Sequence, residues 1–168
     1  DLREAYEGFE FSHASIMTNA LKLENVTKLV SVGVRDVCQA EMDTIFNSND
    51  RIVAYFDEQL KSKAFNGVNW NETCDQIVSE LPQKVYISFD IDGLDPMLCP
   101  TTGTPVPGGL SFEQAVYLIK QVVASGRTII GFDLVEVGPS ESGWDTNVGA
   151  RLLYHLCNQM GLSNGKFA

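Results

Sequence analysis

The chain has 168 residues, of which 22 are acidic and 12 are basic, so its formal net charge is −10. A hydrophobic fraction of 44% is too high for a disordered chain, and the length suits one domain, residues 1–168, with a core of its own. The acidic balance argues against nucleic-acid binding, because neutralising phosphates requires clustered lysine and arginine. The sequence also lacks the run of about 18 apolar residues that a membrane span needs.

The four cysteines, at positions 38, 74, 99 and 157, form no CxxC pair. This spacing excludes a zinc knuckle and a thioredoxin-like motif. A chain of this length does not need disulfides, so we expect reduced, buried thiols and a cytoplasmic protein. The first residue is Asp1, and the charged segment that follows is no targeting signal, which suggests the interior of a longer protein.

The predicted elements alternate along the chain. Four apolar runs predict strands, of which the second is the weakest, at 29–34, 52–56, 85–90 and 128–135. Helical periodicity predicts helices at 73–81, 111–124 and 145–160. The second helix has a capping box, Ser111 with Gln114, and Gly126 beyond its end. Such alternation favours a parallel sheet with helices on both faces.

Two aspartates follow the predicted strand at 85–90, where parallel α/β sheets bind ligands. Asp90 and Asp92 are two residues apart, so both carboxylates project from the same side of an extended chain. Their mutual repulsion favours a hard divalent cation such as Mg²⁺, Mn²⁺ or Ca²⁺ between them. The alternative is a pair of solvated loop acids, and Asp95 before Pro96 is typical of a turn. The glycine- and proline-rich loop 96–109 that follows is long enough to be functional.

Other polar residues have both functional and structural interpretations. Glu136, at the end of the last strand, is suited to pairing with a guanidinium or to a structural salt bridge. His13 lies in a serine-flanked loop and is either a proton shuttle or a surface histidine. We expect Asp133 to cap a neighbouring main-chain group or to pair internally, and His155 to be structural. Arg35 is expected to form an ion pair with Asp36.

Five segments together resemble one enzyme family, the ureohydrolases, which comprise arginase, agmatinase and formimidoylglutamase. They are EGFEFSHAS at 7–15, SFDIDGLDP at 88–96, TGTPVPGG at 102–109, GFDLVEVGP at 131–139 and DTNVGAR at 145–151. The resemblance spans nearly the whole chain, and the 7–15 segment is most like agmatinase. It implies an arginase-like three-layer α/β/α fold with two Mn²⁺ ions at the carboxyl rim of the parallel sheet.

The resemblance also implies roles for five residues. Asp1, Asp90 and Asp92 match metal ligands, His13 matches the histidine that passes a proton to the leaving amine, and Glu136 matches the acid that pairs with the substrate guanidinium. The implied reaction is metal-dependent hydrolysis of a linear amidine, such as agmatine, to urea and an amine.

The chain departs from the family pattern at its start. The family has six metal ligands, three of which come from segments upstream of Asp1, together with N-terminal strands of the sheet. We therefore expect this chain to be the C-terminal part of a family domain. We also expect the isolated chain to bind metal weakly and not to turn over. The alternative is a non-catalytic, truncated or degenerate α/β module.

The sequence does not determine the substrate or the oligomeric state. Arginine and formimidoylglutamate are alternatives to an agmatine-like cation, because discrimination depends on loops that read the far end of the substrate. The resemblance implies homo-oligomers, trimers or hexamers, of the full-length protein. A phospho-accepting receiver domain is disfavoured because no lysine follows the last strand, which ends in Glu136.

Overall fold

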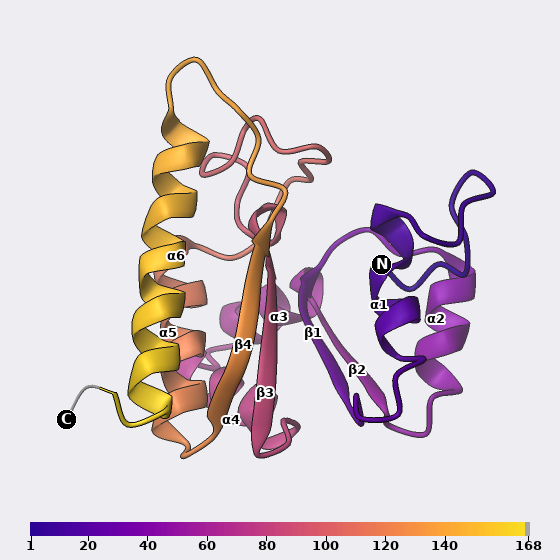
Figure 1. Ribbon diagram of the computed structural model, residues 1–168, viewed down its shortest axis with the longest axis horizontal. Coiled ribbons are helices and arrows are strands. Elements are labelled where there is room, and N and C mark those ends of the chain that lie inside the picture. The colour runs from indigo at the N-terminus through magenta and orange to yellow at the C-terminus, as the bar shows by residue number, and fades with distance from the viewer. Residues whose placement is uncertain (167–168) are drawn as a thin grey trace. The chain divides into compact units, whose positions relative to one another are not determined.

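The computed structural model describes residues 1–166 (Figure 1). Its strands are β1 Leu29–Val34, β2 Ile52–Phe56, β3 Lys84–Asp90 and β4 Thr128–Val135. Its α-helices are α1 Ile16–Ala20, α2 Gln39–Phe46, α3 Asp57–Phe65, α4 Trp70–Ser79, α5 Phe112–Ala124 and α6 Trp144–Ser163. Two short 3₁₀ turns, η1 His13–Ser15 and η2 Ile91–Gly93, complete the set. All four predicted strands are confirmed.

The helix predictions hold in part. Helix α5 begins after Ser111 with the predicted capping box, in which Ser111 Oγ accepts from the Gln114 N–H at 3.1 Å. Helix α4 begins three residues earlier than predicted, because Asn69 caps it by accepting from the Glu72 N–H. Helix α6 continues past its predicted end to Ser163. Helices α1, α2 and α3 were not predicted, because they are short or weakly amphipathic.

The chain divides into two compact units. The first consists of residues 1–31 and 36–54 and the second of residues 32–35 and 55 onward. The first unit holds η1, α1 and α2 with the start of β1 and most of β2. Inside it, the Leu29 N–H donates to the Arg51 carbonyl at 2.9 Å, and the Arg51 guanidinium donates to the carbonyls of Leu21 and Val26. These bonds tie both the start of β1 and the segment before it to Arg51, which directly precedes β2.

The second unit is built on the parallel pair β3 and β4. The register places Lys84 opposite Thr128 and Asp90 opposite Val135, so both strands end at the same edge. Helices α5 and α6 lie side by side and pack against β4, and α4 packs on α5 (Figure 1). The sequence pattern predicted strands buried on both faces, but Tyr86 and Ile130 are 57% and 59% exposed.

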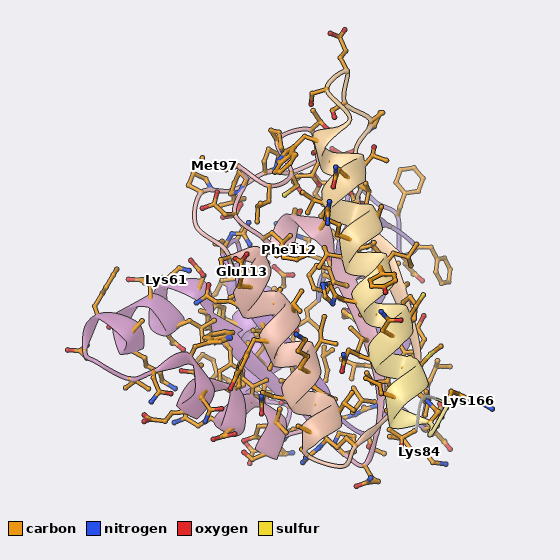
Figure 2. All side chains as sticks on the ribbon, turned by 90° about the vertical axis from the view of Figure 1, so that its left-hand side faces the viewer. Lys61, Lys84, Met97, Phe112, Glu113 and Lys166 are labelled. Carbon is orange, nitrogen blue, oxygen red and sulfur yellow. The ribbon has the colours of Figure 1, made fainter. Side chains whose placement is uncertain are left out.

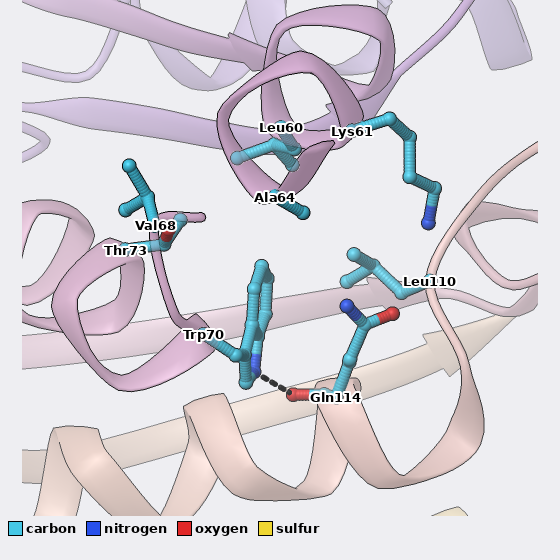
Figure 3. Close-up of a pocket in the computed structure, with 8 residues that line it drawn as sticks. All are labelled: Leu60, Lys61, Ala64, Val68, Trp70, Thr73, Leu110 and Gln114. Carbon is cyan, nitrogen blue, oxygen red and sulfur yellow. Dashed lines mark hydrogen bonds between the residues drawn. The ribbon is translucent and has the colours of Figure 1, made fainter. Parts of the chain in front are cut away.

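Two clusters of apolar side chains form the core of this unit. One lies near the carboxyl ends of the strands and includes Ile91, Leu94 and Leu152, all fully buried. The other lies between β3, β4, α5 and α6 and includes Ile129 and Leu156. Beside the first cluster, α3, α4 and α5 enclose a cavity of about 40 Å³ (Figure 3). That volume is near the size of a single water site.

Two further predictions concern the state of the cysteines and the presence of a membrane span. All four cysteines are free, as predicted, and Cys74 and Cys99 are buried. The expectation of burial is wrong for Cys157, which is exposed on α6, and holds only partly for Cys38. Of the helices within residues 1–166, none combines the length and apolar character needed to cross a bilayer.

Candidate active site

The site builds up from the carboxyl ends of β3 and β4. Beyond them lie two connecting segments, the loop 96–109 and the stretch 136–143 that leads into α6 (Figure 1). In Figure 2, Met97 of the loop lies toward the same end of the unit as Phe112 and Glu113 at the start of α5. Lys84, at the start of β3, lies at the opposite end (Figure 2). Acidic side chains that follow β3 and β4 therefore gather at one rim.

Asp90 and Asp92 are held close together at this rim. The Asp92 N–H donates to Asp90 Oδ1 at 3.0 Å, across the start of η2. The Thr104 hydroxyl, from the long loop, donates to Asp92 Oδ2 at 3.0 Å. Burial raises the pKa of Asp90 to about 7, and the charges of Asp92 and Glu136 add to that effect. The rim thus collects more negative charge than the surrounding protein compensates.

This arrangement fits a hard cation. Carboxylate oxygens are the ligands that Mg²⁺ and Mn²⁺ prefer, and a positive charge would offset both the burial and the repulsion that raise the pKa of Asp90. Within residues 1–166, however, no three His, Cys, Asp or Glu side chains gather closely enough to enclose a metal by themselves. Asp90 and Asp92 are therefore the two carboxylates of this unit that fit a metal.

Glu136 follows β4 in a strained backbone conformation. Its φ is +61°, in the left-handed region that side chains other than glycine rarely adopt. The Thr102 hydroxyl donates to the Glu136 carbonyl at 2.9 Å. A β-carbon built on Gly103 would lie 3.0 Å from Glu136 Oε2, so the lack of a side chain there leaves room for the carboxylate. Such strain is typical of functional positions, and Glu136 is exposed.

The long loop is closed at its base. Leu94 and Leu110 form a parallel bridge, in which the Leu110 N–H donates to the Gly93 carbonyl and the Asp95 N–H donates to the Leu110 carbonyl. Gly109, with φ +94°, has to be glycine, because a β-carbon would lie 2.5 Å from the Leu94 carbonyl oxygen.

Contacts from buried and turn-forming residues support this loop. Asp145, fully buried at the start of α6, accepts from the Thr101 N–H at 2.8 Å. As predicted, Asp95 forms a turn, accepting from the Met97 N–H at 2.9 Å. The predicted internal pairing of Asp133 is confirmed too, since it accepts from the Ser88 hydroxyl at 2.9 Å.

The structure corrects the expected partner of Arg35. Its guanidinium donates to the carbonyls of Gly33, Asp92 and Val106, not to the carboxylate of Asp36. The prediction considered only the neighbouring residue, whereas two of the three acceptors lie 57 and 71 residues away.

The other two predicted site residues, Asp1 and His13, lie in the first unit. The Asp1 carbonyl accepts from the Met17 N–H at 3.1 Å, so the first residues pack against the segment that carries His13. His13 is exposed in η1, with its ring edge-on to Tyr6 at 5.3 Å between centroids. The structure therefore brings Asp90, Asp92 and Glu136 together within one unit and places Asp1 and His13 within the other.

Sequence reasoning missed Glu41, which organises the first unit. Glu41 is 6% exposed, and its carboxylate accepts from the Asp1 α-ammonium and from the N–H groups of Leu2 and Cys38. Burial opposes ionisation of Glu41, but these hydrogen bonds outweigh it and lower its pKa. A capping-box search that accepted cysteine at the first position would have found it, since Glu41 stands three residues after Cys38.

The comparisons with known proteins point to one family. The description "Arginase family" belongs to the family model that matches residues 1–158. An N(1)-aminopropylagmatine ureohydrolase of Thermus thermophilus is 34% identical over 165 residues, covering 98% of this chain and 52% of that protein. An agmatinase of Pyrococcus horikoshii is 31% identical over 157 residues, covering 93% of this chain and 50% of that protein. The chain thus spans about half the length of the curated relatives it matches.

Solved structures agree on the fold. The agmatine ureohydrolase of Thermoplasma volcanium superposes with a TM-score of 0.77 at 25% identity, over 99% of this chain and 53% of that one. An arginase from Medicago truncatula gives a TM-score of 0.76 at 24% identity. The fold is therefore arginase-like α/β.

Proposed function

Because this chain belongs to the arginase family, we propose that it carries part of the active site of a metal-dependent ureohydrolase. The observation that supports this proposal is the gathering of Asp90, Asp92 and Glu136 at one rim, where burial, together with the charges of Asp92 and Glu136, raises the pKa of Asp90 to about 7. The proposed substrate is a linear guanidine of the agmatine type, and the products are urea and an amine.

In this proposal Asp90 and Asp92 would hold Mn²⁺, with Asp1 as a further ligand. Arginase-family proteins generally bind a dinuclear metal site. Bound metal ions would supply the positive charge that activates water for attack on the guanidinium carbon. Glu136 would fix the planar cation through paired N–H···O contacts, which also orients its carbon toward the rim. His13 would pass a proton to the leaving amine, a role that suits a group titrating near neutral pH.

The substrate class follows from the relatives' names. Several relatives are called agmatinase or N(1)-aminopropylagmatine ureohydrolase, and these names specify substrates with a guanidinium at one end. We propose the same class here and not arginine or formimidoylglutamate. The proposed localisation is cytoplasmic, and the proposed assembly of the full-length protein is a homo-oligomer.

Metal binding is tested first, with the 168-residue chain and Mn²⁺ followed by electron paramagnetic resonance. We expect weak binding that Asp90→Asn and Asp92→Asn abolish and that Asp133→Asn leaves unchanged. Asp133 is the matched control, because it lies on β4 next to the rim and its carboxylate is already bonded to Ser88. Mn²⁺ binding that survives both rim substitutions would contradict the proposal. The absence of bound Mn²⁺ would favour the non-catalytic module.

Catalysis is tested by urea release from agmatine, N(1)-aminopropylagmatine, arginine and formimidoylglutamate. The full-length Thermus thermophilus ureohydrolase is the positive control. We expect the 168-residue chain to release little or no urea, and the full-length protein that carries it to prefer the agmatine-type substrates. In that protein Glu136→Gln should weaken substrate binding without releasing Mn²⁺. Turnover by the isolated chain at the control's rate would overturn the expectation of an incomplete site.

A further inference from the structure

Arg35 joins three segments of the second unit that are far apart in sequence. Its Nη1 donates to the Gly33 carbonyl at 3.1 Å, and its Nη2 donates to the carbonyls of Asp92 and Val106. The side chain is half-buried, and its Nε is buried without a partner. Burying a guanidinium that is not fully hydrogen-bonded costs free energy, so the contacts it does make have to offset that cost.

Two of these acceptors belong to the candidate site. Asp92 carries the rim carboxylate, and Val106 lies in the middle of the loop 96–109. The same loop reaches the same aspartate a second time, through the Thr104 hydroxyl and Asp92 Oδ2 at 3.0 Å. Asp92 is thus fixed to the loop through its main chain by Arg35 and through its side chain by Thr104.

The end of the loop has a separate anchor. Lys61, on α3, donates through Nζ to the Gly109 carbonyl at 2.7 Å, and its Nζ lies 3.6 Å from Asp57 Oδ1. Figure 3 shows the Lys61 side chain extended toward the chain that leads into Leu110. This anchor holds the base of the loop and makes no contact with Asp92, so it provides a matched control for Arg35.

We propose that Arg35 is a positioning residue, which holds the Asp92 turn and the middle of the loop 96–109 in one arrangement and thereby sets the place of the Asp92 carboxylate at the rim. The proposal deepens the ureohydrolase proposal above and rests on it for the role of Asp92. Arg35 itself touches neither metal nor substrate in this scheme.

The chemistry of the side chain explains why arginine is needed. A guanidinium presents five N–H donors in a rigid plane, so one residue can bond three carbonyls at fixed mutual positions. The ammonium of a lysine is a compact point on a flexible stem and cannot hold three acceptors at the same geometry. Arg35→Lys keeps the charge and loses this geometry, which makes it the informative conservative variant.

The experiment compares four variants of the 168-residue chain: Arg35→Lys, Arg35→Met, Thr104→Val and Lys61→Met. Hydrogen–deuterium exchange reports on the loop, and Mn²⁺ affinity reports on the rim. We expect both Arg35 variants and Thr104→Val to raise exchange around residues 103–106 and to weaken Mn²⁺ binding, Arg35→Met by at least about tenfold. Lys61→Met should raise exchange only near residues 108–110 and keep the Mn²⁺ affinity within about twofold.

Several outcomes would overturn the proposal. Unchanged exchange at 103–106 in Arg35→Lys would do so, as would an equal loss of Mn²⁺ affinity in Lys61→Met. Increased exchange throughout α5 and α6 in Arg35→Lys would show a merely structural role. If Arg35→Met does not fold, the proposal is tested by Arg35→Lys and by Thr104→Val, a substitution at an exposed residue. An unsubstituted chain that binds no Mn²⁺ contradicts the ureohydrolase proposal, while the exchange data still decide whether Arg35 anchors the loop.

Discussion

Two acidic regions of the molecule contrast sharply, the carboxylate of Glu41 in the first unit and that of Asp90 in the second. Glu41 accepts from two main-chain N–H groups and the α-ammonium of Asp1, and its pKa is lowered. Asp90 accepts from the N–H of Asp92, and burial, with the charges of Asp92 and Glu136 adding to it, raises its pKa to about 7. Burial acts against the charge of both; hydrogen-bond donors outweigh it at Glu41, whereas at Asp90 neighbouring negative charges add to it.

The contrast separates a structural acid from one for which we propose a function. The donors around Glu41 match its charge, so the residue stabilises the start of α2 and the first residues of the chain. The donors around Asp90 do not match the charge collected at the rim, and a cation is the partner that would. An acid whose charge the protein leaves uncompensated is a better indicator of a binding site than an acid that is merely buried.

Removing the Glu41 carboxylate should have the largest effect. Glu41→Ala leaves the N–H groups of Leu2 and Cys38 without their acceptor, and we expect a loss of roughly 2–3 kcal/mol in the free energy of unfolding. Urea denaturation of the chain measures this loss. Glu113→Ala is the control, because Glu113 is an exposed acid in the first turn of α5, and it should change stability by less than about 0.5 kcal/mol. Equal losses in the two variants would contradict a structural role for Glu41.

At the rim, removal of a carboxylate should raise the free energy of unfolding and not lower it. Asp90→Asn keeps an acceptor for the Asp92 N–H and removes a carboxylate whose ionisation burial and the charges of Asp92 and Glu136 oppose. The metal-free protein should therefore become more stable at neutral pH, by about 1 kcal/mol after allowing for solvent screening at this half-buried position. Added Mn²⁺ should raise the melting temperature of the unsubstituted chain and not that of the variant, as mass action requires. If Asp90→Asn is less stable than the unsubstituted chain when both are free of metal, the Asp90 carboxylate has a structural role like that of Glu41.

The pH dependence of the Glu41 contribution should be smaller still. A pKa lowered by folding means that the contribution is present above the pKa of a glutamate in the unfolded chain, about 4.3, and is lost as the pH falls through the folded value. Thermal unfolding of the chain and of Glu41→Gln at about pH 7 and about pH 3.5 measures it. The difference in stability between the unsubstituted chain and Glu41→Gln should shrink by up to about 1 kcal/mol at the lower pH. A difference that grows on acidification would contradict the assignment.

The fold was predictable where local sequence and tertiary packing agree. The run at 128–135 forms a strand with the predicted bounds, because its apolar residues pack against α5 and α6. Ser111 and Gln114 fixed the start of α5, since a capping box depends only on neighbours. Helix α2 was missed because a cysteine, an unusual N-cap, precedes it.

Of the residues at the candidate site, only the acidic ones could be predicted from the sequence. Asp90, Asp92 and Glu136 stand at strand ends, which parallel pairing brings to one edge. Their supports were not predictable, because the hydroxyls of Thr104 and Thr102 reach acceptors 12 and 34 residues away, with no local pattern between them. Arg35 belongs with these supports, since its acceptors depend on how the long loop folds back.

The smallest effect expected concerns the backbone of Glu136, whose φ of +61° suits glycine better than glutamate. Glu136→Ala removes the carboxylate and keeps the strain, whereas Glu136→Gly removes both. Glycine adopts this conformation freely but gains entropy in the unfolded chain, so we expect Glu136→Gly to be more stable than Glu136→Ala by only about 0.5–1 kcal/mol. Urea denaturation of the two variants isolates the strain, because both lack the same carboxylate. Equal stabilities would mean that the backbone of Glu136 is not strained. The rim would then differ from the surroundings of Glu41 in its charges alone.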